Sequence, residues 1–115
     1  MVTTTACINR QRDLFDTDIF KAQAGTGTTA PTSEDTSLET EDSDTLLTVT
    51  TSKTDQSVQV TYVIASTIGD GNAYSEQELQ INSGATMANR IVHEPLTKGA
   101  NDEFTYITNF YFMSA

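Results

Sequence analysis

The sequence predicts an all-β fold, an antiparallel β-sandwich of jelly-roll-like form with an N-terminal arm and a long Gly/Thr/Pro loop. Two observations lead to this prediction. Threonine, valine and isoleucine recur at a period of two in several segments, and turns rich in Gly, Asn, Asp and Ser separate those segments. Helical periodicity is scarce by comparison. Many short strands around one core are therefore the expected arrangement.

The length of 115 residues predicts a single domain over residues 1–115, because chains divide into domains only beyond about 250 residues. We expect residues 1–20 to form an arm or a first strand, residues 21–45 a long ordered loop, and residues 46–115 the sandwich core. Residues 7–20 are mostly polar, so a short helix is a further alternative for them.

The long loop holds almost no apolar side chains between residues 24 and 45. A free linker is one interpretation of such a segment. An ordered loop of this length in a compact domain is usually functional, and we expect a tight turn at Gly25–Thr32, fixed by Pro31 and the threonines.

A hairpin is the clearest local pattern. Residues 46–51 alternate, a polar turn follows at 52–56, and Val58, Val60, Tyr62 and Ile64 then share one face of a second strand. Weaker strands are expected over residues 74–81 and 86–93. Pro95 should end the latter or lie at a sheet edge.

The last predicted strand covers residues 103–113 and has apolar side chains on both faces. Phe104, Tyr106, Phe110 and Phe112 fall on one face, and Ile107 with Tyr111 on the other. Two-sided apolar character predicts either a central strand or a strand covered by a neighbouring subunit. The pair Ile107 and Tyr111 therefore suggests a partner surface.

The charge is strongly acidic, with 16 Asp and Glu against 6 Lys and Arg and a net charge of −10. Nucleic acid and anionic membrane surfaces are poor partners for such a chain, since both attract Lys and Arg. Molar salt shortens the Debye length to about 3 Å and lets carboxylates crowd together. A protein of an extreme halophile and an ordinary acidic domain are both compatible with this balance.

Several other classes receive no support from the sequence. Cys7 is the single cysteine, so an internal disulfide is excluded. No segment approaches the roughly 20 apolar residues of a membrane span, and the N-terminus lacks the pattern of a signal peptide.

Two stretches resemble a known family. Residues 25–32 read GTGTTAPT and residues 35–41 read DTSLETE, followed by Glu78-Leu79, Ser83-Gly84, Arg90, Lys98 and Asp102-Glu103 in order. This succession resembles small structural proteins of tailed viruses. The chain departs from the family at Gln80 and Ile81, where glycine and phenylalanine are usual. The resemblance implies a β-sandwich virion component, such as a head decoration, turret or tail-fibre module, without catalysis.

Motifs for other chemistry are incomplete. Gly25-x-Gly27 lacks the lysine of a phosphate-binding loop and the third glycine of a dinucleotide fingerprint. The acidic clusters at 34–35 and 39–44 lack the spacing of a calcium loop, so a solvated rim is preferred. His93 and Cys7 have no partners at catalytic or metal-binding spacing. We expect no cofactor, no bound metal and no enzymatic activity.

The function expected from the sequence is a virion structural protein on the particle exterior, a capsid decoration or turret subunit that assembles through its β faces. Its expected partners are other copies of itself and virion proteins such as the major capsid protein, with no nucleic acid and no membrane. The alternative is a tail-fibre or baseplate module that contacts the host surface. The expected subunit contacts are Phe15, Ile19, Phe20, Thr28, Pro31, Leu38, Tyr111 and Phe112.

Overall fold

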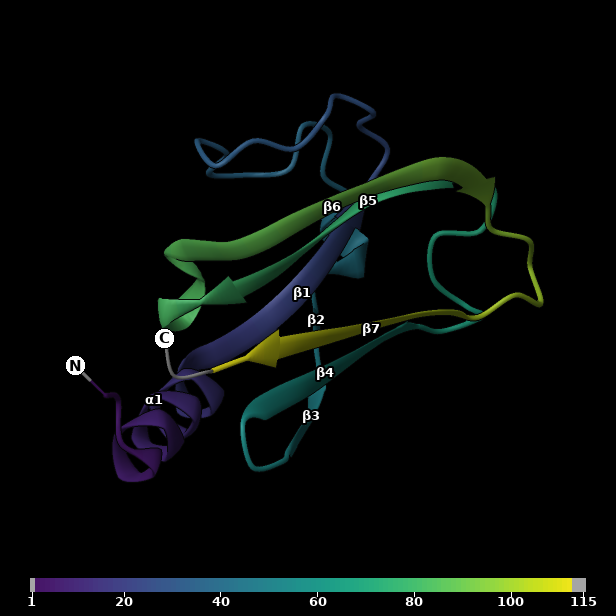
Figure 1. Cartoon of the computed structure of the whole chain (residues 1–115). Helices are drawn as coiled ribbons and strands as arrows, with labels where there is room; N and C mark the ends of the chain where they lie inside the picture. The colour runs from purple at the N-terminus through teal and green to yellow at the C-terminus, as the bar shows by residue number, and fades with distance from the viewer. Residues whose placement is uncertain (1, 113–115) are drawn as a thin grey trace.

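The computed structural model describes residues 2–112, and this part of the chain forms two antiparallel sheets and one α-helix (Figure 1). In chain order the elements are α1 (Thr5–Asp18), β1 (Ile19–Gly25), the 3₁₀ turn η1 (Ser43–Thr45), β2 (Leu47–Thr48), β3 (Thr50–Lys53), β4 (Ser57–Ile64), β5 (Ala73–Ile81), the 3₁₀ turn η2 (Asn82–Gly84), β6 (Thr86–Thr97) and β7 (Phe104–Tyr111). The strand orders are β2-β1-β5-β6 and β3-β4-β7. The prediction of a mainly β, antiparallel fold is confirmed.

The predicted hairpin is present, but its first strand divides between the two sheets. β3 pairs antiparallel with β4 from Thr50 opposite Thr61 to Lys53 opposite Val58. β2 instead pairs with β1 in the four-stranded sheet. Val49 lies between them, so the chain passes from one sheet to the other at this residue.

The core lies between the sheets. β4 contributes Val58, Val60, Tyr62 and Ile64, all buried as the alternation predicts, and the four-stranded sheet contributes Ala22, Ala24, Tyr74 and Leu79. Each large apolar side chain buried in this way stabilises a fold by about 1.5–3 kcal/mol. Half-buried aromatic side chains of β7 pack against this core.

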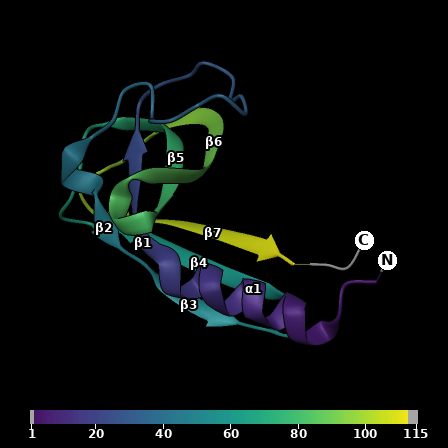
Figure 2. The same ribbon diagram turned by 90° about the vertical axis from the view of Figure 1, so that its left-hand side faces the viewer.

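Within the predicted segment 1–20, the described residues 2–20 form neither an arm nor a strand throughout, because α1 occupies Thr5–Asp18. The side chain of Thr4 caps the helix by accepting from the N–H of Cys7 at 3.2 Å. Arg12 then donates to the carbonyls of Thr54 and Asp55 in the β3–β4 turn. These bonds hold α1 at the end of the three-stranded sheet (Figure 2).

The long loop begins later than predicted, at Thr26 rather than residue 21, because β1 runs to Gly25. β1 pairs with β5 on one side and β2 on the other. Its inward residues Ala22 and Ala24 are small, so β1 lacks the β-branched pattern by which the other strands were predicted.

The strands near the C-terminus agree with the prediction in part. β5 and β6 form as expected, and Pro95 lies in an edge strand, as its missing N–H requires. β7 is also an edge strand, so the prediction of a central position is wrong. The alternative prediction, coverage by a neighbouring subunit, is untested. Met113, at the end of the predicted strand, lies outside the described residues.

Candidate functional site

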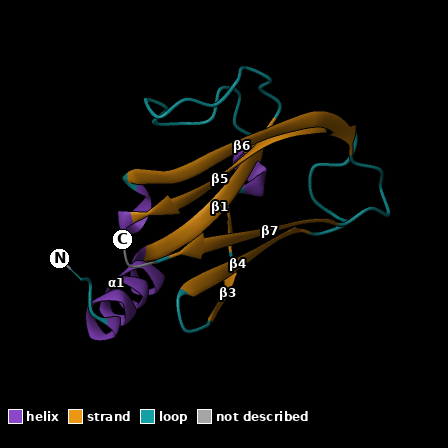
Figure 3. Ribbon diagram, in the orientation of Figure 1, coloured by secondary structure: helices purple, strands orange, loops and turns teal. Residues whose placement is uncertain are grey.

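The loop between β1 and η1 lies on the side of the four-stranded sheet that faces away from the three-stranded sheet (Figures 1 and 3). It contains most of the residues by which the chain resembles virion proteins. A turn over residues 32–35 shapes it through two hydrogen bonds: the N–H of Asp35 donates to the carbonyl of Thr32 at 3.2 Å, and the carboxylate of Asp35 accepts from the N–H of Thr32 at 3.0 Å. The loop is therefore ordered, which excludes the free-linker interpretation.

A buried carboxylate holds this loop to β5. Glu76 is completely buried and accepts hydrogen bonds from the backbone N–H groups of Gly27 at 2.8 Å, Glu39 at 3.0 Å and Thr40 at 2.8 Å. Burial by itself would raise the pKa of Glu76. The N–H donors of Thr40 and Glu39, with Arg90 and Gly27, outweigh it and hold that pKa below the ordinary 4.5. Both ends of the loop therefore meet at one anion.

Arg90 on β6 completes this arrangement. Its guanidinium donates to Glu76 at 3.0 Å, to Asp35 at 3.0 Å and to the carbonyl of Thr29 at 2.9 Å. Only 4 % of the Arg90 side chain is exposed. A planar guanidinium suits such a site because it can donate in several fixed directions. We call Glu76, Arg90, Asp35 and the loop backbone that they bind the loop clasp.

The two glycines of the GTG motif allow the loop to approach the clasp. A Cβ atom on Gly27 would lie 2.5 Å from the Glu76 carboxylate, and one on Gly25 would lie 2.7 Å from it. Neither glycine has a positive φ. Close approach, rather than the expected tight turn or a phosphate site, therefore explains the motif.

A second set of hydrogen bonds fastens the C-terminal end of the loop. The hydroxyl of Tyr74 donates to Asp42 at 2.6 Å, and that of Tyr62 donates to the carbonyl of Thr45 at 2.5 Å. Burial raises the pKa of Tyr74 to about 12 and that of Tyr62 above its ordinary value. Both phenols therefore stay protonated and act as donors.

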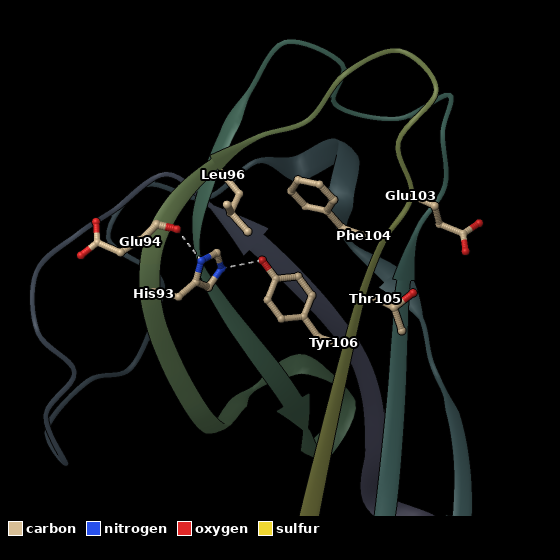
Figure 4. A pocket seen from close by; sticks show the side chains of 7 residues that line it. All are labelled: His93, Glu94, Leu96, Glu103, Phe104, Thr105 and Tyr106. Atoms are coloured by element: carbon tan, nitrogen blue, oxygen red, sulfur yellow. Dashed lines mark hydrogen bonds between the residues drawn. The ribbon is translucent and has the colours of Figure 1, made fainter.

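A shallow groove of about 440 Å³ lies between the edge strands β6 and β7 (Figure 4). The Nδ1 atom of His93 lies 2.8 Å from the carbonyl of Glu94, so Nδ1 carries the proton, and Nε2 accepts from the hydroxyl of Tyr106 at 2.8 Å. In Figure 4 the carboxylates of Glu94 and Glu103 point away from the imidazole. His93 thus links the two sheet edges.

The predicted subunit contacts fall into two groups. Leu38 is only 5 % exposed, Ile19 packs on the core, and Phe15 contacts Phe110 and Phe112 with ring centroids 4.8 and 5.5 Å apart. These four residues, Phe112 included, pack within their own chain. The other four lie on the surface: Phe20, Thr28, Pro31 and Tyr111.

Glu76 is the main residue that the sequence interpretation missed. Glu78 was matched to the acidic position of the family pattern, whereas the clasp uses Glu76. Tyr74 and Tyr62 carried no sequence signal for their hydrogen bonds.

The clasp contains two carboxylates and one guanidinium that satisfy one another, so it can position a loop but offers no free acid, base or nucleophile. Within residues 2–112, no three His, Cys, Asp or Glu side chains are grouped closely enough to hold a metal ion. Over the same residues no helix is long and apolar enough to cross a membrane. No family model, curated protein or solved structure matches the chain.

Proposed function

We propose that this chain is a non-enzymatic structural subunit on the exterior of a tailed-virus particle, most simply a capsid decoration or turret protein. We further propose that its two sheets form a β-sandwich of jelly-roll-like form. Support for the sandwich comes from the shared core, to which both sheets contribute.

The single observation that carries the proposal is the loop clasp. The signature residues by which the chain resembles virion proteins form the contacts that hold the loop in one conformation against the sheet. A rigid projecting loop suits an assembly contact, because little conformational freedom is lost when it binds. Thr28 and Pro31 are exposed on it and can meet another virion protein.

The aromatic side chains favour decoration over the tail-fibre or baseplate alternative. Exposed aromatic residues in loops would suit host recognition. Here Tyr62, Tyr74 and Phe104 lie on strands and pack in or against the core. The tail-fibre or baseplate function is therefore treated only as one possible outcome of the labelling experiment described next.

Immunogold labelling of intact particles, with antibodies against the purified chain, tests the proposal. Label on the head or its vertices is the expected result. Label confined to the tail would support the host-contact alternative, and particles without label would refute a virion role.

Binding of the purified chain to particles provides the matched comparison. Pro31→Glu on the clasped loop should weaken particle binding, whereas Thr67→Glu, at an exposed turn outside that loop, should leave it unchanged. Equal binding by both variants would exclude the loop as the contact.

A further inference from the structure

β7 is one of the two edge strands of the three-stranded sheet, opposite β3, and lacks the features that usually protect such an edge. Charged residues, proline and bulges keep exposed edges from pairing with other chains. β7 contains no charged residue and no proline, and its register with β4 runs without a shift. β6, an edge strand of the other sheet, carries Arg90, Glu94 and Pro95 and has two register shifts against β5. Of the edge strands β6 and β7, only β6 is protected in this way.

The outer face of the three-stranded sheet is a second, independent observation. The side chains of this face alternate along β4 and β7 with those that point toward the core, and the strand register extends the face onto β3. Its members are Thr50, Ser52, Ser57, Gln59, Thr61, Val63, Thr105, Ile107, Asn109 and Tyr111, of which Ser57 is buried. None of them is charged, although the chain has a net charge of −10. We call this the uncharged face. Ile107 is 60 % exposed on it and Tyr111 is 67 % exposed.

The ladder identifies the backbone groups that β7 leaves free. The N–H of Phe112 donates to the carbonyl of Gln56 at 2.7 Å. Bonded and non-bonded pairs alternate in an antiparallel ladder, so the even-numbered residues of β7 direct their N–H and C=O groups toward β4. The N–H and C=O groups of Thr105, Ile107, Asn109 and Tyr111 therefore point to the free edge.

We propose that β7 pairs antiparallel with β7 of a second copy of this chain and joins two three-stranded sheets into one. A two-fold contact places a surface against itself, so an acidic surface would meet like charges. β7 and the uncharged face avoid this repulsion. A phosphate-bearing partner would need Lys or Arg here and a basic partner would need carboxylates, and this strand offers neither. Pairing also covers the half-buried Phe104, Tyr106 and Phe110.

The pairing does not depend on the virion role, and the purified full chain tests it. Size-exclusion chromatography with light scattering in molar salt should give twice the mass of the chain. Asn109→Pro removes an outward N–H and spares the ladder to β4, and Ile107→Glu places a carboxylate on each copy. Both variants should be monomers, with half the mass that light scattering gives for the native dimer. Leu14→Glu on α1, where Leu14 is 55 % exposed, is the matched control and should remain a dimer.

Amide exchange supplies a direct readout, and circular dichroism shows that each variant is folded. The amides of residues 105, 107, 109 and 111 should be protected in the native dimer and exchange quickly in Ile107→Glu. A native chain that runs as a monomer overturns the proposal. So does an oligomer that neither variant dissociates, or a monomer that instead binds immobilised glycans through Tyr111. If Asn109→Pro fails to fold, Ile107→Glu decides the result.

Discussion

Glu76 brings together parts of the chain that are far apart in the sequence. Its carboxylate binds loop backbone 49 residues away at Gly27 and 36 residues away at Thr40, as well as Arg90 on the neighbouring strand. A buried ion pair of this kind contributes little net stability over an apolar pair, yet removal of one partner leaves the other charge buried and unpaired.

Replacement of Glu76 by Gln should therefore be costly. We expect Glu76→Gln to lower the free energy of unfolding by about 3 kcal/mol, because Arg90 loses its most buried carboxylate. Denaturant unfolding at neutral pH measures the loss. Glu94→Gln, at an exposed position on the same strand as Arg90, should change stability by less than about 0.5 kcal/mol. Equal effects of the two changes would contradict the clasp.

Glu78 shows the opposite electrostatic behaviour two residues further along β5. Burial raises its pKa above the ordinary 4.5; a hydrogen bond from Gln80 lowers it, and the carboxylates of Glu41 and Glu76 raise it further. A raised pKa in the folded state means that Glu78 favours folding below its unfolded pKa. That contribution is lost as the pH rises through the folded pKa.

Glu78→Gln should thus stabilise the protein at neutral pH, since glutamine cannot ionise and can still accept from Gln80. The gain should shrink as the pH falls below the ordinary glutamate pKa. Glu76→Gln should behave in the reverse way: its loss is full above that pKa and fades as the pH falls through the lowered pKa of Glu76. Thermal unfolding of both variants across this pH range measures the two trends. Parallel pH profiles would show that the two environments are not distinct.

At the scale of elements, the long loop depends on the two glycines at its start, Gly25 and Gly27. Gly27→Ala should destabilise the fold by about 1–3 kcal/mol, because the new methyl group overlaps the Glu76 carboxylate and the side chain of Glu39. Limited proteolysis should then cut within residues 28–37 faster than in the native chain. Thr28→Ala, the neighbouring exposed position, is the control and should show neither effect. If the loop of Gly27→Ala resisted cleavage, the loop would accommodate the new methyl group by a shift in position and would stay attached to the sheet.

The elements also differ in how far the sequence could predict them. The β3–β4 hairpin followed from Val58, Val60 and Tyr62, because one buried and one exposed face produce a clear period of two. β1 could not be found in this way, since Ala22 and Ala24 are buried through close sheet packing rather than through bulk. α1 has weak amphipathicity, with Ile8 alone buried among its residues, so polar periodicity could not identify it.

The loop of the candidate site was predictable from the sequence, but Glu76 and the contacts that hold the loop were not. The GTGTTAPT and DTSLETE stretches drew attention to the loop. Their common partner, Glu76, lies in another strand, and no local spacing links it to Gly27 or Asp35. The position of β7 was unpredictable for a related reason: two-sided apolar character describes what a strand can bury, not which neighbour buries it.

For the whole molecule, the charge of −10 sets the response to salt. Carboxylates without counter-charges repel one another, and this repulsion weakens as the Debye length falls from about 10 Å at 0.1 M to about 3 Å at 1 M. We expect the unfolding midpoint and the proposed dimerisation to rise together between these concentrations. Titration with a neutral osmolyte is the control, because such a solute is excluded from the protein surface but does not screen the carboxylates. Lower stability in molar salt would exclude adaptation to a halophilic setting.

The long sequence separation across the clasp has a consequence for how this protein is made. A ribosome releases the Gly/Thr/Pro segment well before the strands that supply its carboxylate and guanidinium, separated from it by as many as 61 residues. Until those strands pair, the segment has nothing to fasten it, and closure of such distant contacts is slow. We therefore expect the loop, the proposed assembly contact, to take shape last, so that under the proposed function immature chains could not join a growing particle.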